Sequence, residues 1–256
     1  MSSGQDVIRK SLDLDGFGVS ADPWLSSVTN LNCFRVSISR CAQTRSFTQA
    51  QATGFYTARV EASDLATIET MVSRGFRLVD TAITLRCDAP LDSRRNSSET
   101  LDFSVDKARS QDRRQVELIA SSGFRHSRFH LDPNFPNDIA DEIKRSWASN
   151  LVLGERGDGC LVARRNDRVV GFLGYASSQD EDFKIDLIAV AKSCRGKGIG
   201  SGLVSALQHL AYKQGYAVTV GTQAVNSGSV RLYESLGFRF HSAYHVMHGY
   251  SEVSVS

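Results

Sequence analysis

The stretch "CRGKGIGSG", residues 194–202, places four glycines, an Arg and a Lys directly before an apolar helix pattern. Glycines allow successive backbone N–H groups to converge on one point, and the first turn of a helix adds unpaired N–H groups and a positive dipole end. Arg195 and Lys197 add positive charge at the rim, and no Asp is placed to hold a magnesium ion. The spacing predicts an anion seat whose natural guest is a metal-free pyrophosphate.

Three familiar phosphate loops fit this stretch less well. In a P-loop the Lys follows the last glycine and precedes Ser or Thr, whereas Lys197 lies between Gly196 and Gly198. A dinucleotide fingerprint needs G-x-G-x-x-G straight after a strand. Here the glycines occupy alternate positions, and several residues separate the first of them from the end of the expected strand. A methyltransferase-type G-x-G-x-G is present at 196–200 without the usual acidic residue before it, and remains an alternative.

The elements around the glycine turn alternate between strand and helix patterns. Two helices are expected near 110–122 and around Ile139, Ile143 and Trp147. Strands are expected at 159–165, 168–176 and 182–190 because apolar residues fill these runs between short polar turns. After the turn come a helix around Leu203–Ala211, the strand "YAVTVGTQ", the helix "SGSVRLYESLG" and the strand "FRFHSAYHVMHGY". The turn therefore joins a strand to an amphipathic helix.

The first half of the chain shows a shorter pattern. Strands are expected at 32–40 and 55–62, followed by a helix that Ser63 or Asp64 caps and Gly75 ends, then the strand "FRLVDTAITLR". The polar stretch 88–100 is the best linker candidate, so we expect domains at 1–100 and 101–256, with residues 1–27 irregular. The similarity between "SRGFRLVD" and "SLGFRFHS" suggests that the first half is an internal copy of the second. Helices that end at a glycine explain the similarity equally well.

Two motifs together resemble a known family. "IDLIAV", "RGKGIG" and "NSGSVRLYESLGF" are similar to the GNAT superfamily of acyl-CoA-dependent N-acyltransferases, whose signature pairs R/Q-x-x-G-x-G/A with a later N-x-x-x-x-x-x-Y-x-x-x-G-F. The resemblance implies an α/β (α+β) fold with a mixed, mostly antiparallel sheet flanked by helices. The first half then looks like a reduced GNAT-like domain. The implied co-substrate is acetyl-CoA or another acyl-CoA, without a metal.

The same resemblance implies where coenzyme A contacts the chain. Its pyrophosphate meets the backbone of six consecutive residues, Arg195, Gly196, Lys197, Gly198, Ile199 and Gly200. Its pantetheine arm pairs with the strand edge formed by Ile188, Ala189 and Val190. Asn226 contacts that arm and Tyr233 lies near the sulfur. Both residues occupy the positions that the second motif requires.

Acyl transfer to an amine needs a neutral amine, a polarised carbonyl and a proton for the departing thiolate. Tyr233 can donate that proton, and core packing is its alternative role. A backbone N–H in 188–190 can polarise the carbonyl. Asp186 alternates with Ile188 and Val190, so we expect it on their face of the strand as a base; a solvated strand-end carboxylate is the alternative. Water can also take the proton.

A narrower resemblance concerns the acceptor. "SSGFRHSRFHLDPNFP" and the front segment "RGFRLVD" are similar to TDP-fucosamine acetyltransferases, which acylate the amine of a nucleotide-linked (dTDP) amino-dideoxyhexose for cell-surface polysaccharides. The chain departs from that family at "NCFR", where an F-F-G element is usual. Arg128 is then a candidate for the nucleotide diphosphate and Phe129 for stacking, with ordinary loop packing as the alternative.

The bulk composition excludes several classes of partner. Thirty basic and 28 acidic residues give a formal charge of +2, which argues against nucleic acid or an anionic membrane as partner. No apolar run approaches a membrane span, so we expect a cytoplasmic protein, as a possible homodimer. Five scattered cysteines and spread histidines predict neither disulfides nor a metal site. Two other functions stay open: acylation of another amine (peptide N-terminus, lysine or small amine), or non-catalytic acyl-CoA sensing.

Overall fold

The computed structural model describes residue 12 and residues 14–38, 53–88, 102–177 and 182–251. The chain forms two compact units, of which unit 1 comprises Met1–Thr81 with Ala243–Ser256 and unit 2 comprises Ala82–Ser242. This division differs from the expected domains in two ways. It falls before the polar stretch 88–100, most of which lies outside the described residues. The end of the chain also returns to unit 1, because its last strand pairs there.

Unit 1 contains one curved set of strands and two helices. Its elements are β1 (Gly18–Ala21), α1 (Pro23–Thr29), β2 (Cys33–Ser37), β3 (Gly54–Glu61), α2 (Leu65–Ser73), the first part of β4 (Arg77–Cys87) and the second part of β10 (Arg239–Ser251). β1 is antiparallel to β2, β2 is parallel to β3, and β3 is antiparallel to β10, where Tyr244–Ser251 pair with Glu61–Gly54. These pairings tie the end of the chain to unit 1.

The N-terminal segment is more regular than its sequence suggests. Residues 1–27 were expected to be irregular, whereas Gly18–Ala21 form β1 and α1 starts at Pro23. The helix is capped by Asp22, whose Oδ1 accepts from the Leu25 N–H at 3.1 Å. An Asp N-cap with Pro at the first helical position is a strong start signal, but seven residues are too few to show a helical period.

The helix and strands expected in the first half are confirmed. Asp64 caps α2 by accepting from the Thr67 N–H at 3.2 Å, and Gly75, with φ +95°, ends it. The apolar side chains of α2 and the strands form one buried cluster: Leu12, Val36, Tyr56, Ala58, Val60, Met71, Phe76 and Met247. Unit 1 therefore has its own core. That it is a degenerate GNAT-like copy stays a prediction.

Unit 2 contains a run of neighbouring strands in the order β4-β9-β8-β7-β6-β5. Its further elements are β5 (Ser104–Lys107), α3 (Arg113–Gly123), α4 (Arg128–Leu131), α5 (Asn137–Leu153), β6 (Gly159–Arg165), β7 (Arg168–Ser177), β8 (Asp182–Val190), α6 (Ile199–Gln214), β9 (Ala217–Gln223) and α7 (Ser227–Ser235). Only the β8–β9 pairing is parallel among the neighbours that these strands form. The expected mixed, mostly antiparallel sheet is confirmed.

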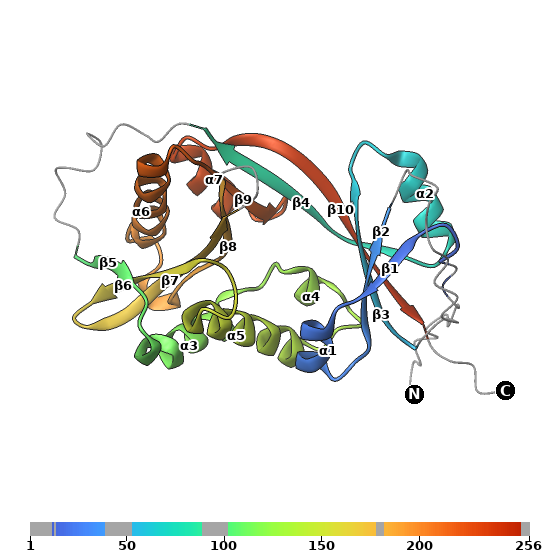
Figure 1. Ribbon diagram of the computed structural model, residues 1–256, viewed down its shortest axis with the longest axis horizontal. Coiled ribbons are helices and arrows are strands. Elements are labelled where there is room, and N and C mark those ends of the chain that lie inside the picture. The colour runs from blue at the N-terminus through green and yellow to red at the C-terminus, as the bar shows by residue number, and fades with distance from the viewer. Residues whose placement is uncertain (1–11, 13, 39–52, 89–101, 178–181, 252–256) are drawn as a thin grey trace, which may run out of the picture. The chain divides into compact units, whose positions relative to one another are not determined.

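Helices cover both faces of this sheet (Figure 1). Strand alternation explains the two layers: on β6, Leu161 and Ala163 pack with α6, whereas Cys160 and Val162 pack with α3 and α5. The four described cysteines are buried. One short helix, α4, was not expected, because four residues within a polar loop give no periodic signal. None of the described helices is long and apolar enough to cross a membrane.

Candidate functional site

The glycine turn is open and rich in unpaired donors. Gly196 and Gly198 have φ of +75° and +73°, and a Cβ built on either would meet no atom within 4 Å. The first backbone bond of α6 runs from the Gly202 N–H to the Gly198 carbonyl. Within the described residues, the N–H groups of residues 196–201 donate to no acceptor. Six consecutive free donors therefore lie at the N-terminus of a 16-residue helix, an arrangement that can bind an anion; that an anion binds here stays a prediction.

The two basic residues of the turn have different surroundings. Arg195 donates from Nε to the carbonyl of Val190 at 3.2 Å and from Nη2 to the carbonyl of Gly123 at 2.8 Å. Its guanidinium therefore joins the end of β8 to the end of α3 and holds the turn in place. Lys197 is exposed and makes no ion pair or hydrogen bond with another described residue. It remains a charged rim group.

Strand β8 separates from β9 half-way along its length. The parallel pairing runs from Asp182↔Ala217 to Ile185↔Val220 and stops there. On its other edge, Gly174 pairs with Leu187 and Tyr175 with Ile185, so Asp186 is the extra residue of a β-bulge. Beyond Ile185, the edge of β8 that faces away from β7 has no partner strand among the described residues. Ile188, Ala189 and Val190 lie on this stretch, and the Val190 carbonyl there already accepts from Arg195 Nε.

The bulge changes the face on which Asp186 lies. Ile188 and Val190 pack against the α6 cluster, whereas the Asp186 carboxylate reaches the α5 side. There it accepts from Trp147 Nε1 at 2.8 Å and from Arg156 Nε at 2.6 Å. The expected shared face is therefore wrong, because one extra residue inverts the alternation. Since an arginine and an indole hold the charged carboxylate, a role as base is not favoured.

Tyr233 lies in the same apolar cluster as the β8 edge. Its side chain is only 2% exposed, and its ring centroid is 5.5 Å from that of Phe238. Ile188, Val190 and Ile199 belong to or pack against this cluster, so the second motif meets the strand edge and the start of α6. Burial raises the pKa of the Tyr233 hydroxyl above its usual 10. The hydroxyl therefore stays protonated across the physiological range.

Asn226 has a structural role that the motif alone does not reveal. It is the N-cap of α7, and its Oδ1 accepts from the Ser229 N–H at 3.3 Å. Its Nδ2 lies 3.5 Å from Thr222 Oγ1, at the limit of a hydrogen bond. The cap therefore occupies the side-chain oxygen and leaves the amide nitrogen as the group that can contact a ligand.

The acceptor candidates of the polar loop separate into two environments. Phe129 is 2% exposed, and its ring centroid lies 5.0 Å from that of Phe135. It is a core residue, so the expected stacking on a base or sugar is wrong and the packing alternative holds. Arg128, half-buried on α4, lies with its Cζ 4.6 Å from the Phe129 ring centroid. Only Arg128 remains a candidate for the acceptor.

Three residues near the bulge were missed by sequence reasoning. Trp147 was recognised only as part of an apolar helix face, yet its N–H holds Asp186. Arg156, just after α5, lies with Cζ 4.1 Å from the Trp147 ring centroid and pairs with Asp186. Lys144, on α5, is 8% exposed. A basic residue at i−3 from an apolar-face tryptophan was the available signal for Lys144; Arg156 gave none.

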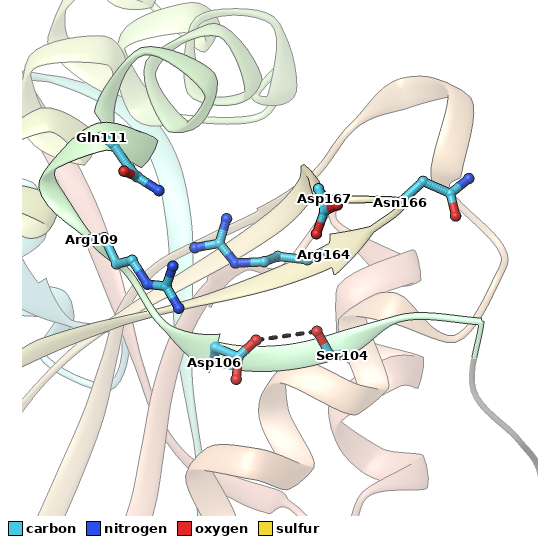
Figure 2. A pocket seen from close by; sticks show the side chains of 7 residues that line it. All are labelled: Ser104, Asp106, Arg109, Gln111, Arg164, Asn166 and Asp167. Carbon is cyan, nitrogen blue, oxygen red and sulfur yellow. Dashed lines mark hydrogen bonds between the residues drawn. The ribbon is translucent and has the colours of Figure 1, made fainter.

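Unit 2 also contains a polar cavity at the β5–β6 edge (Figure 2). The cavity has a volume of about 520 Å³ and includes none of the predicted site residues. Arg109 and Arg164 line it together with Asp106 and Asp167. Arg164 also pairs with the buried Asp112 at 2.5 Å. The positive charges that line the cavity are thus balanced by carboxylates of the same chain. Among the described residues, no group of three or more His, Cys, Asp or Glu could hold a metal ion.

Comparison with known proteins agrees with this geometry. Residues 125–238 match the acetyltransferase (GNAT) family. The matched residues lie within unit 2. A functionally unknown conserved protein from Staphylococcus epidermidis has a similar fold, with a TM-score of 0.64 and 14% identity over 98% of this chain and 95% of that one. The expected GNAT fold is confirmed. Enzymes of the GNAT family use acetyl-CoA.

Two curated proteins are similar to part of this chain. The spore coat polysaccharide biosynthesis protein SpsD of Bacillus subtilis is 35% identical over 131 residues, which are 51% of this chain and 45% of SpsD. The N-acetylaspartate synthetase of Danio rerio is 40% identical over 113 residues, which are 43% of this chain and 38% of that protein. The chain thus spans less than half the length of either relative.

Proposed function

We propose that this chain transfers an acetyl or other short acyl group from coenzyme A to the amine of a nucleotide-linked (dTDP) amino-dideoxyhexose. The observation that carries the coenzyme A part is the run of six free N–H groups at 196–201, next to an unpaired strand edge, in a GNAT domain. The similarity to a polysaccharide biosynthesis protein supports a sugar amine as acceptor. The half-buried guanidinium of Arg128 supports an anionic acceptor.

The residues present can perform each step of this transfer. Backbone N–H groups on the β8 edge hold the thioester and polarise its carbonyl oxygen. The acceptor nitrogen then forms the new C–N bond, and the C–S bond breaks. Tyr233 hydrogen-bonds to the departing sulfur and supplies its proton, which the acceptor amine, through water, returns to the hydroxyl. Because the hydroxyl stays protonated at neutral pH, it is ready to donate throughout that range.

One assay tests the proposal. Release of free thiol is measured for acetyl-CoA and longer acyl-CoAs against dTDP- and UDP-linked amino sugars, with free amino sugars as matched controls. We expect turnover with a nucleotide-linked amine. With the free sugar we expect an activity at least about tenfold lower. If coenzyme A binds but no amine yields thiol, the chain is a sensor. If another amine is preferred, the acceptor assignment is wrong.

A second acceptor class has its own support. The similarity to an N-acetylaspartate synthetase favours an amino acid that carries additional carboxylates. Aspartate, glutamate and their amides therefore belong in the same panel. Faster turnover with aspartate than with asparagine, together with no turnover of amino sugars, would select this class.

A further inference from the structure

Lys144 is a buried amine without an acidic partner. Its side chain on α5 is 8% exposed, and its Nζ lies 5.1 Å from the ring centroid of Phe124 and 4.6 Å from that of Trp147. No hydrogen bond or ion pair joins this Nζ to another described residue. Two aromatic faces are therefore its direct contacts when it is charged. Burying an ammonium in this way costs free energy unless an anion pairs with it or it loses its proton.

The charges around Lys144 are predominantly positive. The guanidiniums of Arg128, on α4, and Arg156, after α5, act on it together with the carboxylate of Asp186, on β8. That carboxylate is already held by Arg156 and Trp147. Burial is the largest cause that lowers the pKa of Lys144, to about 7, and the two guanidiniums lower it further than Asp186 raises it. Two cations and one anion thus act on Lys144, and that anion is shared with Arg156.

The Asp186 carboxylate connects this cationic cluster to β8, on the face of the sheet opposite to the Tyr233 cluster. Asp186 is the bulge residue of β8, directly before the free edge at 188–190. Arg156 keeps 35% of its side chain exposed, and Arg128 is half-buried, so two forked donors lie at the rim and the amine lies deeper. Planar guanidiniums bind carboxylates and phosphates through two parallel hydrogen bonds.

We propose that Arg128, Lys144 and Arg156 form a subsite for an acidic group of the acceptor, a carboxylate or a phosphate, and that filling this subsite charges Lys144. The inference rests on the proposed function, because it places the acceptor beside the β8 edge. The inference adds two points to that function: the acceptor carries an acidic group, and the protein takes up a proton when the acceptor binds. A bound anion stabilises the ammonium form of Lys144, so the neutral amine gains a proton as the complex forms.

The test measures anion binding by calorimetry on the full chain, without turnover. Coenzyme A is present at saturation so that the glycine turn is filled, and the probes are dTDP, inorganic phosphate and aspartate. Titrations at pH 8 in two buffers of different ionisation enthalpy give the number of protons taken up. We expect one probe to bind with uptake approaching one proton, and its affinity to fall as pH rises above 7.

Two variants identify the residue that takes up the proton. Lys144→Met is expected to weaken binding of the probe about tenfold and to remove the proton uptake. The matched control, Lys213→Met, changes an exposed lysine at the end of α6 and should do neither. Tighter binding of dTDP or phosphate identifies a phosphate group, and tighter binding of aspartate a carboxylate. Binding without proton uptake in the unmodified chain, equal uptake in Lys144→Met, or no binding of any probe overturns the proposal.

Failure of the proposed function gives a different result. If coenzyme A binds and a probe binds with proton uptake, but no amine is acylated, the subsite stands and the acyltransferase proposal falls. If amines are acylated while no probe depends on Lys144, the acyltransferase proposal stands and the subsite falls.

Discussion

Arg195 donates from Nη2 to the carbonyl oxygen of Gly123 at 2.8 Å, across 72 positions of sequence. The same guanidinium donates to the Val190 carbonyl. One side chain therefore joins the last residue of α3, the last residue of β8 and the glycine turn. A residue chosen by sequence as a charge for a phosphate thus has a positioning function as well.

Replacing Arg195 separates these two functions. In Arg195→Ala both carbonyls lose their donor, and we expect a loss of about 1 kcal/mol of stability, since exposed hydrogen bonds contribute little more. The KM for acyl-CoA should rise about tenfold because the turn is no longer braced. Lys197→Ala, on a residue without described partners, should leave the melting temperature unchanged and raise KM less. Equal melting temperatures for both variants would contradict the brace.

Two glycines at opposite ends of α6 provide a matched pair. Gly198 and Gly215 have φ of +73° and +72°, and a Cβ on either would meet nothing within 4 Å. Alanine at each position therefore carries a similar backbone cost, roughly 1–2 kcal/mol. Only Gly198→Ala places a methyl group at the anion seat. We expect similar urea midpoints for the two variants, and at least tenfold weaker coenzyme A binding for Gly198→Ala alone.

Tyr233→Phe tests the proton donor while keeping the ring in its cluster. We expect kcat to fall about 10²-fold, as for loss of a general acid, with little change in melting temperature. Because burial raises the pKa of this hydroxyl, its ionisation should cause no alkaline loss of kcat below pH 10. A pH–rate profile measured from pH 6 to 10 checks this. Full activity in the Phe variant would exclude Tyr233 as the acid.

The cap formed by Asn226 can be separated from any ligand contact. Asn226→Ala should cost about 1 kcal/mol of stability through loss of the N-cap. Asn226→Ser keeps a good cap and removes the amide nitrogen, so it should retain the melting temperature and raise the KM for acyl-CoA. Asp64→Ala, which removes the corresponding cap of α2, is the control for stability alone. An unchanged KM in the Ser variant would limit Asn226 to capping.

Lys144 gives a prediction about stability and pH. Its pKa is about 7 in the folded chain and 10.5 for an exposed lysine, so between these values the unfolded chain binds more protons. Stability contributed by this site therefore rises with pH across that window, by up to about 1.4 kcal/mol per unit. Urea unfolding at pH 7, 8 and 9 should show the stability of Lys144→Met relative to the unmodified chain falling steadily. A constant difference would contradict the lowered pKa.

The sequence predicted those features of the fold that short-range patterns determine. The glycine turn, the strands of unit 2 and the start of α2 at Asp64 depend on short-range periodicity and capping, and each was found where expected. The face of Asp186 was not predictable, because one bulged residue inverts the alternation and leaves no mark in composition. Phe129 was misjudged because the polar residues around it give no sign of how deeply its ring packs against Phe135. The cluster around Lys144 joins α4, α5 and β8, so only the tertiary structure reveals it.

The unpaired edge of β8 has a consequence for solubility. A row of free backbone donors and acceptors inside a sheet is a template for any extended segment, including one from a second copy of the chain. A thioester that hydrogen-bonds along this edge occupies the position of the missing strand. Saturating acyl-CoA should therefore slow aggregation of the protein on mild heating, so the co-substrate would also protect the chain that consumes it.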